Sequence, residues 1–303
     1  MTRFAELGLV FIAIFSTLNL SISVRDDAPL YVMPWMCLEI CDSKEEIQTQ
    51  LGVVEQRKDL LSGVSYEKYT LGPYCELVKN ESLTIISKDD LHGLDDWPMI
   101  SSYPHPPEFI TWFRSVIYSK ACTEKFIASA IEEATKFSYT GYNLDWEPVF
   151  SEGGDGHQMP LTEKDALQYA KFIDTFALAL HSNGFKLGVD VANWSSGDGA
   201  PPIWDFDAIA NTSVDKVISM STYTSNDELF AANVDALVDA FGERSGVGLM
   251  TVNATDETSA LSTAEIQYRF DTIASSSVKE VDIWRMPIPD NFWDVIEEAM
   301  RSN

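Results

Sequence analysis

One segment of the sequence carries an amide and two carboxylic acids at alternate positions: Thr140-Gly141-Tyr142-Asn143-Leu144-Asp145-Trp146-Glu147-Pro148. Because side chains alternate between the two faces of a strand, Asn143, Asp145 and Glu147 share one face, and the apolar side chains between them share the other. Burying such polar groups costs free energy unless they form hydrogen bonds or do chemistry. The polar face therefore predicts either a catalytic site or a buried polar network that only fixes the fold.

The two carboxylic acids also influence each other's ionisation. Like charges disfavour double ionisation, so we expect one of the two to titrate high and to hold a proton near neutral pH. A protonated Glu147 beside an ionised Asp145 is suited to protonating a glycosidic oxygen. Pro148 ends the predicted strand, which places Glu147 at its C-terminal end.

The elements that would position these acids alternate along the chain. Eight apolar runs predict strands, at 30–36, 63–71, 97–102, 140–147, 185–193, 215–223, 247–252 and 281–286. Helical patterns occur at 43–61, 107–118, 122–137, 162–182, 227–241, 263–274 and 292–301. Strand and helix in alternation imply parallel strands joined by right-handed crossovers. We predict an α/β fold, a single (β/α)8 TIM barrel with its active site at the C-terminal ends of the strands. The alternative is a doubly wound open sheet, which is less favoured because no glycine-rich phosphate loop follows an early predicted strand.

The acidic segment resembles the signature of glycoside hydrolase family 18, Asp-x-x-Asp-x-Asp-x-Glu, on the fourth strand of a TIM barrel. Thr140, Asn143, Asp145 and Glu147 occupy its four positions, so the first two acids are replaced by Thr and Asn. The Asn variant is similar to that of lysosomal chitobiase-type members. We identify the chain as a divergent chitinase- or chitobiase-like member, because the third predicted strand lacks the family's Ser-x-Gly-Gly.

The resemblance implies retaining catalysis assisted by the substrate, an exception to the usual scheme with a carboxylate nucleophile. Glu147 would protonate the leaving oxygen and then serve as base for water. Asp145 would hold the acetamido N–H of the substrate and stabilise the oxazolinium ion, and Asn143 would anchor Asp145 by a hydrogen bond. Neither a metal nor a cofactor is needed in this scheme.

Aromatic residues near other predicted strand ends are candidates for sugar contacts. Tyr223 resembles the tyrosine of the family's Met-x-Tyr-Asp element, whose hydroxyl bonds the acetamido carbonyl, although Thr224 stands where Asp is usual. Trp284 matches the tryptophan that floors the sugar subsite, because apolar sugar faces stack on aromatic rings. Weaker candidates for substrate binding follow other predicted strands: Trp35, Trp194 and Tyr103. For each of them the alternative is an ordinary core aromatic.

Composition and charge narrow the partners of the chain. Its 303 residues carry a formal net charge of −26 at pH 7. Such a surface repels nucleic acid and anionic membranes and is suited to a neutral or amino-sugar glycan. The expected partner is an oligosaccharide or glycan that contains N-acetylglucosamine, bound by a monomer.

The chemistry leaves open a chitinase-like lectin that binds without cutting, but such proteins usually lose the final Glu, which this chain keeps. A third alternative is an unrelated structural barrel.

The N-terminus and the cysteines predict export. Residues 1–23 resemble a signal peptide, with a basic residue, an apolar stretch and small polar residues, which leaves 24–303 as the catalytic domain. Cys37, Cys41, Cys75 and Cys122 could form two disulfides in one of three connectivities. Zinc is a weaker interpretation, since the histidines are scattered. Four Asn-x-Ser/Thr triplets are candidate glycosylation sites, at Asn80, Asn193, Asn211 and Asn253. We expect a secreted protein or one of the lysosomal or vacuolar lumen.

Overall fold

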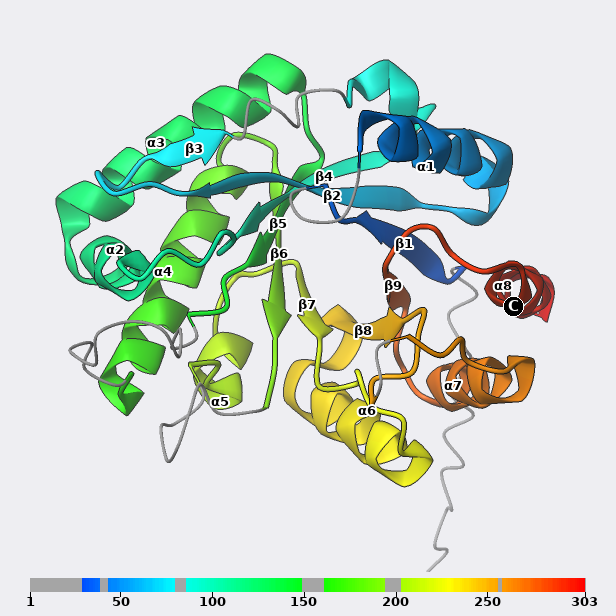
Figure 1. The fold of residues 1–303 in the computed structure, drawn as a ribbon. Helices are drawn as coiled ribbons and strands as arrows, with labels where there is room; N and C mark the ends of the chain where they lie inside the picture. Colours follow the sequence, from blue (N-terminus) through cyan, green and yellow to red (C-terminus); the bar gives the residue numbers. More distant parts are fainter. Residues whose placement is uncertain are drawn as a thin grey trace, which may run out of the picture.

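The computed structural model describes residues 29–38, 43–79, 86–148, 161–193, 203–255 and 258–302. Nine strands form one sheet, and β1 pairs in parallel with both β9 and β2, which closes the sheet into a barrel. The short β3 (Leu77–Lys79) is antiparallel to β2 and lies outside the ring. Figure 1 shows the ring, with β1 (blue) beside β9 and the helices outside. The TIM barrel predicted from the sequence is confirmed.

The eight parallel strands of the ring have these bounds: β1 (Tyr31–Met36), β2 (Gly63–Leu71), β4 (Asp95–Ser101), β5 (Gly141–Asp145), β6 (Lys186–Val191), β7 (Lys216–Ser219), β8 (Ser245–Met250) and β9 (Glu280–Trp284). All eight were predicted as strands. The predicted strand at 140–147 ends at Asp145, and the one at 215–223 ends at Ser219. These two early ends determine how the site residues reach the barrel mouth.

The helices have these bounds: α1 (Lys44–Arg57), α2 (Phe109–Tyr118), α3 (Lys120–Phe137), α4 (Glu163–His181), α5 (Phe206–Ala210), α6 (Asp227–Phe241), α7 (Thr263–Ser275) and α8 (Asp290–Ser302). Local sequence explains several of their starts. Capping boxes begin α1, α4 and α7, in which Ser43, Thr162 and Ser262 each exchange hydrogen bonds with an acidic residue three positions on. Among the described helices, α5 and the short 3₁₀ turns at 88–91 and 242–244 were not predicted, and the helix predicted at 43–61 ends in a 3₁₀ turn at 58–60.

The alternation along each strand divides the apolar side chains into two cores. A large cluster lies between the strands and the helices. A small separate cluster, with Met33, Trp35, Trp97, Met99 and Ile218, fills the inside of the barrel. Polar and charged groups share the inside with this small cluster, because the inward positions of β5, β6 and β9 carry acids.

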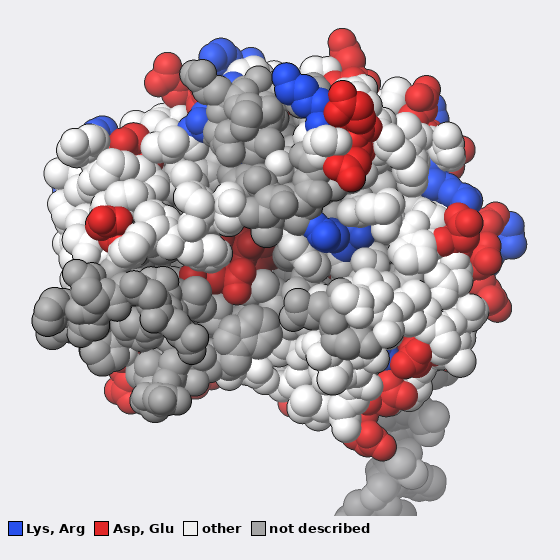
Figure 2. All heavy atoms as spheres, viewed as in Figure 1, with Lys and Arg blue, Asp and Glu red and all other residues white. Residues whose placement is uncertain are grey.

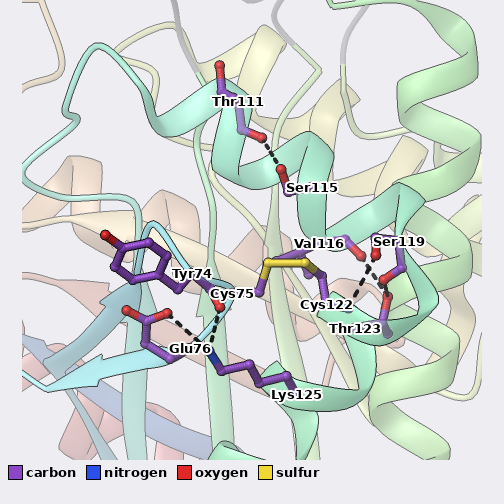
Figure 3. The surroundings of a disulfide bond; sticks show 10 residues. All are labelled: Tyr74, Cys75, Glu76, Thr111, Ser115, Val116, Ser119, Cys122, Thr123 and Lys125. Carbon is purple, nitrogen blue, oxygen red and sulfur yellow. Dashed lines mark hydrogen bonds and ion pairs between the residues drawn. A yellow bond between two sulfur atoms is a disulfide. The ribbon is translucent and has the colours of Figure 1, made fainter.

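One disulfide ties the loop before β3 to α3. Cys75 and Cys122 are bonded, with their Cα atoms 5.1 Å apart. Lys125 of α3 reaches back to the same loop, where its Nζ donates to the Tyr74 carbonyl at 2.8 Å (Figure 3). Of the three connectivities, this bond leaves only the one that joins Cys37 to Cys41. Cys37 is disulfide-bonded, and Cys41 lies outside the described residues.

Two predictions about export concern segments that the structure does not describe. The predicted signal peptide, 1–23, and Asn80 lie outside the described residues. Within the described ranges, no helix combines the length and apolarity that crossing a membrane requires.

Candidate active site

The strand β5 places its side chains on two faces as the sequence predicts. Tyr142, Leu144 and Trp146 are 0% exposed and belong to the cluster under the helices. The Trp146 ring stacks on Phe172 of α4, with centroids 5.1 Å apart. Since these side chains face outward, Asn143 and Asp145 face the inside of the barrel.

Asp145 and Glu147 lie at the C-terminal mouth of the barrel. Asp145 is the last residue of β5, and Glu147 follows two positions later. The residue that follows β4 holds the chain here, because the Glu147 N–H donates to the Ser102 hydroxyl at 3.2 Å. Both acidic residues are half-buried, and Asp145 Oδ1 is a buried atom with no hydrogen-bond partner among the described residues. Figure 2 shows Asp and Glu atoms (red) in a recess near the middle of the view.

The ionisation of the two acids is coupled through burial and charge. Burial, then the charges of Glu147 and Glu67, raises the pKa of Asp145 well above its usual value. Burial also raises the pKa of Glu147. A proton retained by this pair agrees with the sequence-based expectation.

Asn143 does not make the contact that was predicted for it. Its Nδ2 donates to Asp190 Oδ2 of β6 at 2.9 Å, and its Oδ1 has no partner in the described part of the chain. The expected anchoring bond from Asn143 to Asp145 is therefore wrong. The reason is that β6 supplies a carboxylate on the same inner face, one strand away.

Tyr223 reaches the acids by a turn and not along a strand. The strand β7 ends at Ser219, and the Tyr223 N–H then closes a turn onto the Met220 carbonyl at 2.9 Å. The strand predicted at 215–223 is thus too long at its C-terminal end, and its inner face carries Ile218 of the small cluster. Met220 is a core residue, 4% exposed.

The Tyr223 hydroxyl nevertheless lies among the acids of the barrel. It is buried and has no partner among the described residues. Burial raises the pKa of this hydroxyl well above its usual value, and the charges of Asp190, Asp145, Asp282 and Glu147 raise it further. The structure therefore brings Tyr223 to the same site as Asp145 and Glu147.

The aromatic candidates occupy different places. Trp284 ends β9, is half-buried, and meets Trp35 edge to face, with centroids 6.0 Å apart. Trp35 is 2% exposed and its Nε1 donates to Asp282 at 3.2 Å, so it packs inside the barrel and does not offer a free face to a sugar. Tyr103 is half-buried in the turn after β4 and meets His105 edge to face. Trp194 lies outside the described residues.

Sequence reasoning missed three acids inside the barrel: Glu67, Asp190 and Asp282. Asp190 and Asp282 are 0% exposed on β6 and β9. The signal was present, since polar residues alternate with apolar ones in both strands, as they do in β5. Gly246 of β8 leaves room for Asp282, because a Cβ at this glycine would lie 3.2 Å from Asp282 Oδ2. Across the described ranges, no group of three acidic, histidine or cysteine side chains is arranged to hold a metal ion.

Solved structures of other proteins have the same fold as this chain. No family model and no curated protein matches the sequence. Among solved structures, a chitinase from Chromobacterium violaceum matches with a TM-score of 0.69 at 12% identity, over 89% of this chain and 99% of the other. The Bacillus cereus spore cortex-lytic enzyme SleL matches with a TM-score of 0.68 at 11% identity, over 89% and 74%. A mutant class V chitinase from Nicotiana tobaccum, in complex with NAG4, matches with a TM-score of 0.66 at 10% identity, over 91% and 99%. At these identities the likeness shows the fold alone: the chain has a TIM barrel like that of these chitinases and of SleL.

Proposed function

We propose that this chain is a glycoside hydrolase that cleaves β-linked N-acetylglucosamine, in chitin oligosaccharides or in the core of N-linked glycans. The observation that carries the proposal is the exit of β5. Its inner face delivers Asp145 and Glu147 together to the mouth of a family 18-like barrel, while the residues between them are locked under the helices. A purely structural polar network would not need a carboxyl group at the open end of the barrel.

In the proposed reaction Glu147 protonates the glycosidic oxygen while the acetamido oxygen of the substrate attacks the anomeric carbon. The bond to the leaving sugar breaks, and an oxazolinium ion forms. Asp145 accepts the acetamido N–H and balances the positive charge of this ion. Glu147 then removes a proton from water, and the water oxygen attacks the anomeric carbon. The bond from this carbon to the acetamido oxygen breaks, which opens the oxazolinium ring and gives net retention of configuration. No protein nucleophile, metal or cofactor takes part in these steps.

The charges at the site fit these reaction steps if substrate binding shifts the shared proton from Asp145 to Glu147. An N–H donated to Asp145 favours its ionised form and so opposes the burial that raises its pKa. With Asp145 charged, the shared proton is left to Glu147, where the first step needs it. The Tyr223 hydroxyl, which lacks a partner in the described chain, would donate to the acetamido carbonyl.

The substrate class follows from the fold and from these groups. A structural relative was solved with NAG4, a name that indicates an N-acetylglucosamine oligomer. Trp284 at the mouth is the proposed floor of the sugar subsite, and Trp194 and Tyr103 are further proposed contacts. The disulfide fits export, to the outside or to a lysosomal or vacuolar lumen, and we propose that the protein acts there as a monomer.

The test is the Glu147→Gln variant with a chromogenic chitobioside as substrate. Loss of the acid and base should lower the rate by about 10²–10⁴-fold, with an unchanged fold. Glu55→Gln, on an exposed position of α1, makes the same chemical change away from the site and should keep full activity. Full activity in Glu147→Gln would end the assignment. Glycan binding without turnover in the unaltered protein would identify a lectin.

A further inference from the structure

Asp190 is a buried acid to which the proposed reaction gives no role. It lies on β6, which pairs in parallel with β5, and the last paired residues are Leu144 and Val189. Asp145 and Asp190 each follow directly, so they are neighbours across the two strands on the inner face. Neighbouring strands are about 4.8 Å apart, so the two carboxyl groups lie side by side inside the barrel.

A hydrogen bond fixes the orientation of Asp190. Its Oδ2 accepts from Asn143 Nδ2 at 2.9 Å, and both side chains are 0% exposed. Asp190 Oδ1 has no partner in the described ranges. Gly188 makes room for the Lys216 side chain beside this pair, because a Cβ there would lie 2.9 Å from Lys216 Cε and 3.0 Å from Lys216 Cγ.

The groups around Asp190 act on its charge in both directions. Burial raises its pKa most, and the charges of Asp145 and Asp282 raise it further. Lys216 of β7 and the N–H of Asn143 lower that pKa, because each stabilises the ionised form. The charge of Asp190 in turn acts on two buried hydroxyl groups, those of Tyr223 after β7 and Tyr169 on α4.

This arrangement compensates for a departure from the family pattern. The family 18 signature has an acid at position 143, where this chain has Asn, while the neighbouring strand provides an acid bonded to that Asn. An amide at 143 can donate to a carboxylate on β6, which an ionised acid at 143 could not do. The number of acids beside Asp145 is thereby kept, although one of them has moved to another strand.

We propose that Asp190, held by Asn143, is a positioning residue that sets the charge carried by the Asp145–Glu147 pair. The inference rests on the proposed function, in which that pair exchanges a proton with the substrate. Asp190 itself touches neither substrate nor reacting atoms. Its effect is electrostatic: a negative charge on Asp190 opposes ionisation of Asp145 and helps the pair to retain one proton.

Three variants test the proposal through the pH dependence of kcat/KM. Asp190→Asn removes a negative charge beside Asp145, so both limbs of the profile should move to lower pH, by about 1–2 pH units. Asn143→Asp adds a negative charge and should move both limbs to higher pH. The double variant Asn143→Asp/Asp190→Asn restores one amide and one acid, and its profile should return close to that of the unaltered protein.

A matched control and a second measurement separate this role from a structural one. Asp282→Asn removes another fully buried acid, whose charge acts on Asp190 and Tyr223, and should give a clearly smaller shift. Thermal unfolding identifies any variant that fails to fold. Carbon-13 NMR titration of labelled aspartates then reports the pKa of Asp145 directly, without turnover, in the unaltered protein and in Asp190→Asn.

The outcomes are distinct for the two proposals. An unshifted Asp145 titration in folded Asp190→Asn, or shifts of equal sign in Asp190→Asn and Asn143→Asp, would overturn the role of Asp190. A protein without turnover, or an active Glu147→Gln, would instead overturn the proposed hydrolase. In that case the NMR titration still decides whether Asp190 controls the charge of Asp145.

Discussion

At the scale of single residues, the site combines acids whose ionisation is opposed by burial with a hydroxyl that has no described partner. Asp145 Oδ1 and Tyr223 Oη are both buried and lack hydrogen bonds in the described ranges. Leaving buried polar atoms unpaired costs free energy, about 1–3 kcal/mol each. A site that gains its missing partners from a substrate would explain why these groups remain there.

Tyr223→Phe tests this explanation, because it removes only the hydroxyl oxygen. We expect kcat to fall by about 10–10³-fold, as for loss of a donor to a developing charge. The free energy of unfolding should be unchanged or higher, since an unpaired buried hydroxyl disappears. The measurement combines steady-state kinetics with thermal unfolding. A clear loss of stability at constant kcat would show that this hydroxyl serves the fold and not the reaction.

At the scale of elements, the strand pattern predicted the barrel correctly but placed the ends of some strands wrongly. Both β2 and α6 have their predicted bounds, because long periodic runs are bounded there by turn residues. In β7, apolar and β-branched residues continue past Ser219 into a turn, and sequence alone does not mark that change. The partner of Asn143 could not be predicted either, since it depends on which inward residue of β6 stands beside β5.

A glycine on β8 shows how one element shapes the site on another. A Cβ at Gly248 would lie 2.7 Å from the Ser219 carbonyl and 2.9 Å from Tyr223 Cε1. Gly248→Ala should therefore lower the free energy of unfolding by about 1–3 kcal/mol and displace the Tyr223 ring, with loss of activity. Gly52→Ala is the matched control, because its Cβ would meet nothing within 4 Å. In helix α1 it should stabilise by about 0.5–1 kcal/mol. Equal effects of the two changes in unfolding experiments would refute the steric account.

At the scale of the whole molecule, buried acids and a net charge of −26 should make stability depend on pH in an unusual direction. Burial raises the pKa of Asp96 to about 6, and it raises the pKa values of Asp145, Asp190 and Asp282 well above their usual range. As the pH falls, these groups bind their protons at a higher pH in the folded state than in the unfolded chain, where such acids are ionised above about pH 4. Their contribution to stability is therefore lost as the pH rises toward and through their folded-state pKa values.

The expected result is a Tm that rises as the pH is lowered from 8 to about 5.5. Loss of like-charge repulsion acts in the same direction, and an acidic lumen would then be a favourable environment. Differential scanning calorimetry across this range measures the effect. Asp282→Asn should flatten the slope, because an amide that cannot ionise replaces an acid that binds its proton at a higher pH in the folded state than in the unfolded chain. A Tm that is highest at pH 8 would contradict this account.

The stereochemistry of the first product tests the central claim most directly. Proton NMR of a reducing-end signal, recorded within minutes of adding the protein to an N-acetylglucosamine oligomer, distinguishes the two anomers before they interconvert. Asp145 and Glu147 acting with the acetamido group of the substrate predict the β-anomer first. Initial release of the α-anomer, or intact oligomer after prolonged incubation at pH 4–8, would contradict the account.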